Sequence, residues 1–130
     1  MQELQTRFGT GSVSEVEVFH GTRKQIIGTI ISDGFDAGKN VRSAFGKGIY
    51  FSNSANMSKD YSDVPEDGVS YMIISSMLVG PVVLGSSCFT IDTNLYTAAV
   101  DRITSPSIYV CPKNEYAVPR YVVAFHKNAN

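Results

Sequence analysis

The sequence predicts an α+β domain built mainly from strands, with two short helices near its start. Stretches of alternating or β-branched residues recur along the chain and give about five or six strands. Helical spacing of apolar residues appears only early, so the steady strand-helix alternation of a doubly wound parallel sheet is missing. The 130 residues suit one hydrophobic core, so we expect a single domain over 1–130.

The first third of the chain contains the first predicted strand and the longer predicted helix. Residues 1–14 are polar and mixed, and the glycines near their end predict a flexible lead-in. Residues 15–20 alternate polar and apolar side chains, as a half-buried strand does. Thr22 is then a suitable N-cap for a helix whose isoleucines share one face. Asp33-Gly34 predicts the end of that helix.

Beyond Gly34 the chain is expected to alternate loops with short strands. The segment 35–46 has no sustained period, which predicts a loop. A brief helix capped by Asn53 or Ser54 is expected to run to about Tyr61. Residues 85–105 are predicted to be irregular. The strands expected here are 48–52, 69–84 as one bent strand or two with a break at Gly80-Pro81, 108–111 and 121–125.

The overall charge and hydropathy exclude several classes of protein. Eleven basic against twelve acidic residues give a net charge of −1, without the excess of lysine and arginine that binding to nucleic acid requires. No apolar run approaches the ~20 residues that cross a bilayer, and no signal peptide is visible. We therefore expect no membrane association, a monomer as the default oligomeric state, and a cytoplasmic or nuclear location.

Metal and disulfide chemistry receive little support from the sequence. The two cysteines, Cys88 and Cys111, form no C-x-x-C pair, and with His20 and His126 they could supply metal ligands only from scattered positions. We expect no metal. The cysteines are either two small buried thiols or one disulfide in an oxidising compartment.

The common motifs for nucleotide binding and hydrolysis are absent. The segment that begins at Gly46 differs from G-x-G-x-x-G because Phe51 stands at its last position. No P-loop, G-x-S-x-G or H-E-x-x-H sequence occurs. A dinucleotide-binding Rossmann domain, an ATPase, a serine hydrolase and a zinc protease are therefore not predicted.

A less common set of residues remains as the candidate site. His20 closes the first predicted strand, Tyr50 lies on the second, and Tyr61 follows on the short helix. A histidine at a strand end and two tyrosines on neighbouring elements can line one cleft, and two aromatic faces suit a planar ring.

These residues belong to motifs that resemble the catalytic domain of the poly(ADP-ribose) polymerase family. The likeness spans about residues 16–126. It implies the diphtheria-toxin-like ADP-ribosyltransferase fold, with split, mostly antiparallel sheets and two short helices, and NAD⁺ as co-substrate. The motifs, in the order of the family, are His20-Gly21-Thr22-Arg23, Gly34-Phe35, the block from Phe45 to Ser52, and Ser58 followed by Tyr61.

The resemblance implies a role for each residue around the nicotinamide. Gly21 would bind the carboxamide through its backbone N–H and C=O, where a side chain would block the approach. Ser58 would add a hydroxyl hydrogen bond to the same carboxamide. Tyr50 and Tyr61 would sandwich the ring and offer a π face to its positive charge.

Two further residues are implied on the adenosine side of NAD⁺. His20 would hydrogen-bond the adenosine ribose and hold the dinucleotide bent, so its role is orientation rather than proton transfer. Thr22 would add a hydroxyl contact to that ribose.

The third position of the family's catalytic triad is Ile108 in our interpretation. Polymer-forming members carry a glutamate there, and Glu115 lies in an Asn-Glu-Tyr sequence that imitates the segment around it. Counting back without gaps from Pro119 and the strand that follows it puts Ile108 at the triad position and Glu115 in a turn. Glu115 remains the alternative.

A His20-Tyr50-Ile108 triad resembles the members that transfer single ADP-ribose units, because no carboxylate is left to activate the hydroxyl of a growing chain. We therefore expect an NAD⁺-dependent mono-ADP-ribosyltransferase that releases nicotinamide. Two alternatives stay open: an NAD⁺ glycohydrolase, and a catalytically inactive module that binds NAD⁺, ADP-ribose or protein. Set beside the family, the short loop between Gly34 and Gly46 suggests an open donor site. The acceptor, protein or nucleic acid, is not predicted.

Overall fold

A computed structural model describes residues 2–9, 11–39 and 44–127, and it confirms the predicted α+β class. The α-helices are α1 (Gln2–Phe8), α2 (Lys24–Asp33) and α3 (Ala55–Ser58), and the 3-10 turns are η1 (Ala37–Lys39), η2 (Lys59–Tyr61) and η3 (Asn114–Tyr116). The strands are β1 (Ser14–Gly21), β2 (Ile49–Ser52), β3 (Val69–Val79), β4 (Val82–Leu84), β5 (Ala98–Val100), β6 (Ile108–Cys111) and β7 (Ala117–His126).

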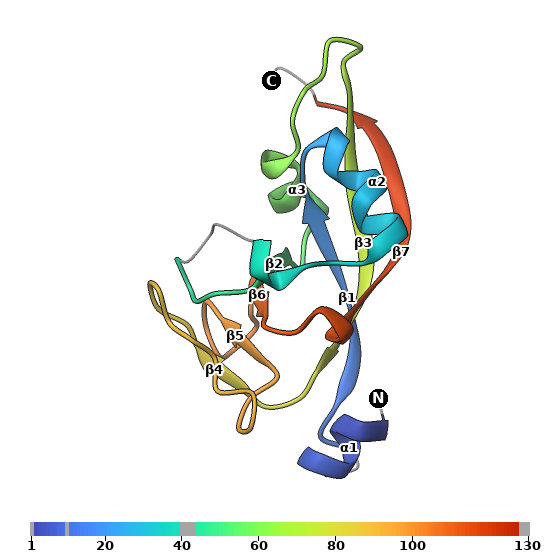
Figure 1. The fold of residues 1–130 in the computed structure, drawn as a ribbon. Helices are drawn as coiled ribbons and strands as arrows, with labels where there is room; N and C mark the ends of the chain where they lie inside the picture. Colours follow the sequence, from blue (N-terminus) through green and yellow to red (C-terminus); the bar gives the residue numbers. More distant parts are fainter. Residues whose placement is uncertain (1, 10, 40–43, 128–130) are drawn as a thin grey trace.

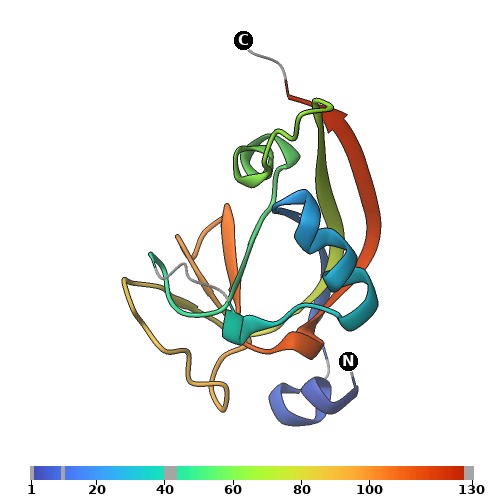
Figure 2. The ribbon, with the colours of Figure 1, turned by 45° about the horizontal axis from the view of Figure 1, so that its top comes forward.

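All described strands form a single hydrogen-bonded order, β4-β5-β6-β2-β1-β3-β7. Every neighbouring pair is antiparallel except β4 with β5. The order divides into two halves. We call β1, β3 and β7 the long-strand half and β2, β4, β5 and β6 the short-strand half. Figures 1 and 2 show the two halves diverging from each other, with α2 lying against β3 and β7.

The long-strand half is the most extensively paired part of the molecule. β1 pairs with β3 from Ser14 opposite Val79 to Gly21 opposite Met72, and β3 continues into a nine-residue register with β7. Val18, Ile73 and Met77 are fully buried at the centre of this half. On α2, Ile27 and Ile30 are the buried residues, and they join the same hydrophobic cluster. Helical and strand periodicities thus meet in one core, as amphipathic elements require.

The short-strand half meets the long-strand half at one point. β2 pairs with β6 over four residues but pairs with β1 only between Phe19 and Ser52. Because so few backbone hydrogen bonds connect the two halves, they can diverge at this point. A small cavity lies beside the junction. The candidate site lies at this junction.

The N-terminal segment differs from the predicted flexible lead-in. Residues Gln2–Phe8 form helix α1, with Glu3 and Arg7 paired across one turn. Leu4 and Val13 are buried in the main core. The polar, mixed composition and the glycines predicted a flexible segment, but Leu4 and Val13 are covered by the rest of the domain.

Helix α2 begins without the N-cap that the sequence predicts. Its N-cap is Arg23 rather than Thr22, and no side chain of the N-cap residue bonds the first turn. The Asp63 carboxylate instead accepts a hydrogen bond from the Lys24 backbone N–H at 2.9 Å, and the Lys24 ammonium pairs with Asp67. An acidic group from a distant loop thus satisfies a donor at the start of the helix.

Three strand assignments also change. The run 69–84 forms two strands, β3 and β4, because the chain leaves β3 at Gly80-Pro81. β5 lies inside the stretch 85–105 that we predicted to be irregular. β7 begins at Ala117, earlier than predicted, and it accommodates Pro119 at a register shift next to Ser75. An edge strand tolerates proline because the missing N–H costs no ladder bond at a bulge.

No disulfide joins the two cysteines, and Cys111 is buried whereas Cys88 is exposed, so neither the disulfide nor a pair of buried thiols is found. Burial raises the pKa of the Cys111 thiol to about 12. None of the helices among the described residues is long and apolar enough to cross a membrane.

Candidate active site

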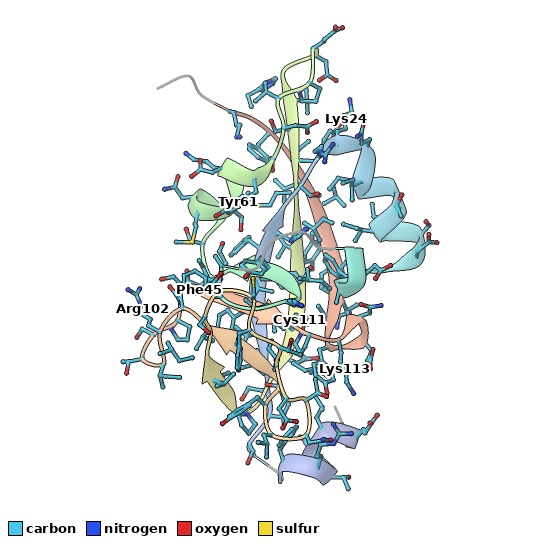
Figure 3. The ribbon with its side chains drawn as sticks, turned by 60° about the vertical axis from the view of Figure 1, so that its left-hand side comes forward. Lys24, Phe45, Tyr61, Arg102, Cys111 and Lys113 are labelled. Atoms are coloured by element: carbon cyan, nitrogen blue, oxygen red, sulfur yellow. The ribbon has the colours of Figure 1, made fainter. Side chains whose placement is uncertain are left out.

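A narrow cavity at the junction of the two halves collects most of the predicted site residues. It is lined by Gly21, Tyr50, Phe51, Ser52, Met57, Ser58, Tyr61 and Ile108. These residues come from β1, β2, β6 and the segment α3-η2. In Figure 3 the labelled Tyr61 lies beside α3, on the side of the molecule that also carries Phe45 and Arg102.

The cavity measures about 20 Å³, room for roughly one water molecule rather than a pyridine ring. Tyr61, at 45% exposed, is the outermost of its lining residues that the sequence singled out. The cavity is partly open to solvent, and its lining already brings the predicted residues together.

Tyr50 is held by its hydroxyl as well as by its strand. The hydroxyl donates to the Gly46 carbonyl at 2.7 Å and accepts from the Phe45 N–H at 2.8 Å. The loop before β2 is thereby tied to the ring that lines the cavity. A fixed ring costs less entropy when it stacks against a ligand.

His20 lies next to the cavity and does not line it. Its ring contacts Phe35 and Phe51 with centroids 5.4 Å away in each case. Its Nδ1 lies 2.7 Å from the Tyr50 backbone carbonyl, which can only accept, so Nδ1 carries the hydrogen. In the neutral ring Nε2 is then an acceptor, which suits a sugar hydroxyl.

Gly21 is required by the fold. A Cβ on Gly21 would overlap the backbone carbonyl of Ser58, so β1 and α3 approach each other as closely as their backbones allow. The sequence assigned this glycine to ligand binding only. The structure adds that no larger residue fits between the strand and the short helix.

Ser58 is buried, and its hydroxyl lies in a compact network at the base of the cavity. It donates to the Phe19 carbonyl at 2.9 Å and lies 2.6 Å from the Ser52 hydroxyl. Ser52, Phe51 and Met57 are lining residues that our sequence reasoning missed. Alternation along β2 with Tyr50 could have pointed to Ser52, because residues two apart on a strand share a face.

Ile108 lines the cavity, and Glu115 lies in a turn, as the sequence interpretation expected. Ile108 begins β6 opposite Ser52 and lines the cavity, whereas Glu115 lies exposed in η3, beyond the end of that strand. The catalytic roles of His20, Tyr50 and Ile108 stay predictions.

Asp101 fixes the start of β6. One of its carboxylate oxygens accepts hydrogen bonds from the backbone N–H groups of Ser107 and Ile108, at 3.0 and 3.1 Å. These two hydrogen bonds to the Asp101 carboxylate, which follows β5, therefore fix the position of Ile108. Burial, and to a lesser extent the nearby Asp101 charge, also raises the pKa of Tyr109, the next residue of β6.

Thr22 is half-buried and, like His20, is not among the residues lining the cavity. Part of the loop predicted to leave the donor site open, residues 40–43, lies outside the described residues. Within 2–9, 11–39 and 44–127, no cluster of three or more histidine, cysteine or acidic side chains could hold a metal ion.

Comparison with known families identifies the fold and the motifs together. The family model described as the poly(ADP-ribose) polymerase catalytic domain matches residues 2–121. The chain belongs to this family. The predicted resemblance is confirmed.

Two human relatives are mono-ADP-ribosyltransferases by name. The chain is 30% identical to protein mono-ADP-ribosyltransferase PARP14 over 89% of its own length and 7% of that protein. It is 29% identical to PARP12 over 95% of its length and 19% of that protein. The chain therefore spans a small part of these relatives.

A solved structure has the same fold. The PARP domain of Arabidopsis RADICAL-INDUCED CELL DEATH1 superposes with a TM-score of 0.82 and 24% identity, covering 98% of this chain and 75% of that one. This likeness confirms the ADP-ribosyltransferase fold that the motifs implied.

Proposed function

We propose that this chain transfers a single ADP-ribose unit from NAD⁺ to an acceptor and releases nicotinamide. The observation that carries the proposal is the single cavity lined by Gly21, Tyr50, Ser58, Tyr61 and Ile108. Membership of the polymerase catalytic domain family supports NAD⁺ as the co-substrate. The names of the relatives support transfer of one unit rather than of a chain.

In the proposed reaction the bond between C1′ of the ribose and the nicotinamide nitrogen breaks, and the electron pair leaves with nicotinamide. A nucleophile of the acceptor forms a new bond to C1′, and its proton passes to solvent. The positive charge of the pyridinium is neutralised as it leaves, while the ribose passes through an oxocarbenium-like state. No redox partner is needed.

The residues of this chain act on that reaction by orientation. The Tyr50 ring, fixed by its hydroxyl, and the Tyr61 ring hold the nicotinamide between them. Gly21 and Ser58 fix the carboxamide, and the His20 Nε2 accepts from the adenosine ribose. Because the donor is held in one conformation, its C1′ atom faces the arriving acceptor in the reactive orientation, which lowers the entropic part of the barrier.

Ile108 leaves the proposed site without a general base at the third triad position. An apolar side chain at this position offers no acceptor for the proton of an ADP-ribose hydroxyl, so chain growth has no base. The acceptor must bring its own assistance or be reactive by itself. This is the physical reason to expect one unit per acceptor.

The proposal is tested by incubating the purified protein with NAD⁺ labelled on the adenine side and measuring labelled acceptor and free nicotinamide. We expect single-unit labelling with release of nicotinamide. His20→Ala and Tyr50→Ala are each expected to lower the rate by a factor of ~10² through lost positioning of the donor.

Glu115→Ala is the matched control, since Glu115 is exposed in η3 and does not line the cavity. Its activity should equal that of the wild type. A collapse of transfer in Glu115→Ala would reject Ile108 as the third triad residue. Release of nicotinamide without labelled acceptor would identify an NAD⁺ glycohydrolase, and absence of both would reject the enzyme in favour of a binding module.

A further inference from the structure

At the base of the cavity the hydroxyl groups of Ser52 and Ser58 have fewer hydrogen atoms to donate than they have hydrogen-bond contacts. Ser52 Oγ lies 2.6 Å from the Ser54 carbonyl and 2.6 Å from Ser58 Oγ, and Ser58 Oγ lies 2.9 Å from the Phe19 carbonyl. Each hydroxyl has one hydrogen to donate. Three contacts therefore compete for two hydrogens, and one contact always lacks its hydrogen.

This competition leaves the network with alternative arrangements. Ser52 can donate to the Ser54 carbonyl or to Ser58, and Ser58 can donate to the Phe19 carbonyl or to Ser52. Both serines are at most 3% exposed, so the network is shielded from bulk solvent. The arrangements differ by the rotation of two hydroxyl groups alone, with no movement of the backbone.

We propose that Ser52 is a positioning residue that supports Ser58 when the carboxamide of nicotinamide occupies the cavity. The inference rests on the proposed function. When Ser58 turns its hydrogen from the Phe19 carbonyl to the carboxamide oxygen, Ser52 turns its own hydrogen onto the Ser58 oxygen. Ser52 Oγ then still accepts from the Ser54 N–H at 3.3 Å.

The chain Ser54 N–H to Ser52 to Ser58 to carboxamide runs in one direction. A hydroxyl that accepts one hydrogen bond becomes a better donor in the next, and the effect is larger in a buried site. Ser52 thus strengthens the contact of Ser58 with the ligand without touching the carboxamide. Its position opposite Ile108, at the only pairing of β2 with β1, holds the network at the junction of the two halves.

The test is a double-mutant cycle on Ser52→Ala and Ser58→Ala, read by calorimetric titration with nicotinamide. Ser52→Ala should weaken binding by about three- to tenfold, the range for one buried hydrogen bond. In the Ser58→Ala background the same substitution should change nothing, because the intermediary is gone. A structural role of Ser52 would instead weaken binding in both backgrounds.

Ser54→Ala is the matched control. Ser54 touches Ser52 through its backbone N–H and C=O, so loss of its side chain leaves the network intact and binding unchanged. Ser52→Thr, which restores the hydroxyl, should recover most of the affinity. If Ser52→Ala lowers the melting temperature too far for titration, Ser52→Cys replaces it as a weak donor of similar size.

Kinetics give a second readout. For NAD⁺ turnover, Ser52→Ala should raise KM by a similar factor with a smaller change in kcat, since the carboxamide contact is made in the ground state. Unchanged or tighter nicotinamide binding in Ser52→Ala would overturn the inference, and so would an equal effect in the Ser58→Ala background.

The two proposals fail differently. A wild-type protein that neither binds nicotinamide nor turns over NAD⁺ rejects the proposed function and this inference with it. A wild-type protein that binds nicotinamide with the expected coupling between Ser52 and Ser58, but transfers nothing, supports the inference and rejects only the enzyme.

Discussion

The long-strand half and the short-strand half are built on different principles. β1, β3 and β7 are held by long registers, with eight paired positions between β1 and β3 and nine between β3 and β7. In the short-strand half β5 pairs with β6 at only two positions and β4 with β5 at three. The long strands are held mainly by their backbone hydrogen bonds. The short strands depend in addition on side-chain hydrogen bonds that connect them to neighbouring loops.

The site uses both halves. Gly21 and His20 come from the long β1, whereas Tyr50, Ser52 and Ile108 come from the short β2 and β6. One half provides a firm edge, and the other presents its residues on strands whose positions are set by single contacts such as the Tyr50 hydroxyl and the Asp101 carboxylate. Substitutions should therefore affect the two halves differently.

The largest effect is expected where the halves meet. Gly21→Ala forces a Cβ into the Ser58 carbonyl, and neither backbone can move without breaking β1 or α3. We expect the free energy of unfolding to fall by ~3 kcal/mol and transfer to be lost, as overpacking against backbone does. Urea denaturation and labelled NAD⁺ measure the two effects.

Gly28→Ala is the control for that substitution. Gly28 lies within α2, and a Cβ there meets nothing within 4 Å. Its replacement should raise the free energy of unfolding by ~0.5 to 1 kcal/mol through helix propensity, with activity unchanged. Equal tolerance of alanine at both glycines would contradict the tight contact at the junction.

Tyr50→Phe examines a tether of the short-strand half. The substitution keeps the ring but leaves the Phe45 N–H and the Gly46 carbonyl without their partner. We expect a loss of ~2 kcal/mol of stability for two hydrogen bonds. Transfer should fall less than in Tyr50→Ala, because the stacking surface remains. Thermal unfolding and initial rates, measured for both variants, distinguish the contribution of the Tyr50 hydroxyl from that of its aromatic ring.

Cys111 gives the short-strand half a dependence on pH. Burial raises its folded pKa to about 12 from the ordinary value of 9.0, so the folded state keeps a proton that the unfolded state loses. Stability from this group is complete below pH 9.0 and falls as the pH rises toward about 12. At one pH unit above the unfolded pKa the loss is ~1.4 kcal/mol.

The measurement compares urea denaturation of the wild type and Cys111→Ala from neutral pH to about one unit above the ordinary thiol pKa. The alanine variant should show the flatter profile, whatever constant loss the missing sulfur causes. In the folded protein a thiol reagent should label exposed Cys88 and spare Cys111. Rapid native labelling of both thiols would be inconsistent with the buried position of Cys111.

The smallest effect is expected at the start of α2, the helix that lies beside the long-strand half. Asp63→Ala removes the acceptor of the Lys24 N–H and should cost ~1 kcal/mol of stability, as loss of a helix cap does. Thr22→Ala should leave the free energy of unfolding unchanged because Thr22 is not the cap. If Thr22 contacts the adenosine ribose as predicted, the same variant weakens NAD⁺ binding. Chemical denaturation and titration with NAD⁺ distinguish the two roles.

Much of the candidate site was predicted through the resemblance to the family. Its motifs singled out Gly21, Tyr50 and Ser58, and counting back from Pro119 separated Ile108 from Glu115. The predicted line of elements was also largely correct, because alternation and helical spacing depend on neighbours in the chain.

The sequence by itself determined the α+β class, the family motifs and most, but not all, of the residues that line the cavity. Only the tertiary structure decided that α1 is ordered, that Asp63 rather than Thr22 serves the start of α2, that β5 forms, and that Ser52 lies against Ser58. Each of these depends on a partner distant in the chain or on burial by several elements. β5, three residues of Ala-Ala-Val, is a strand because β4 and β6 flank it, and no local signal encodes that arrangement.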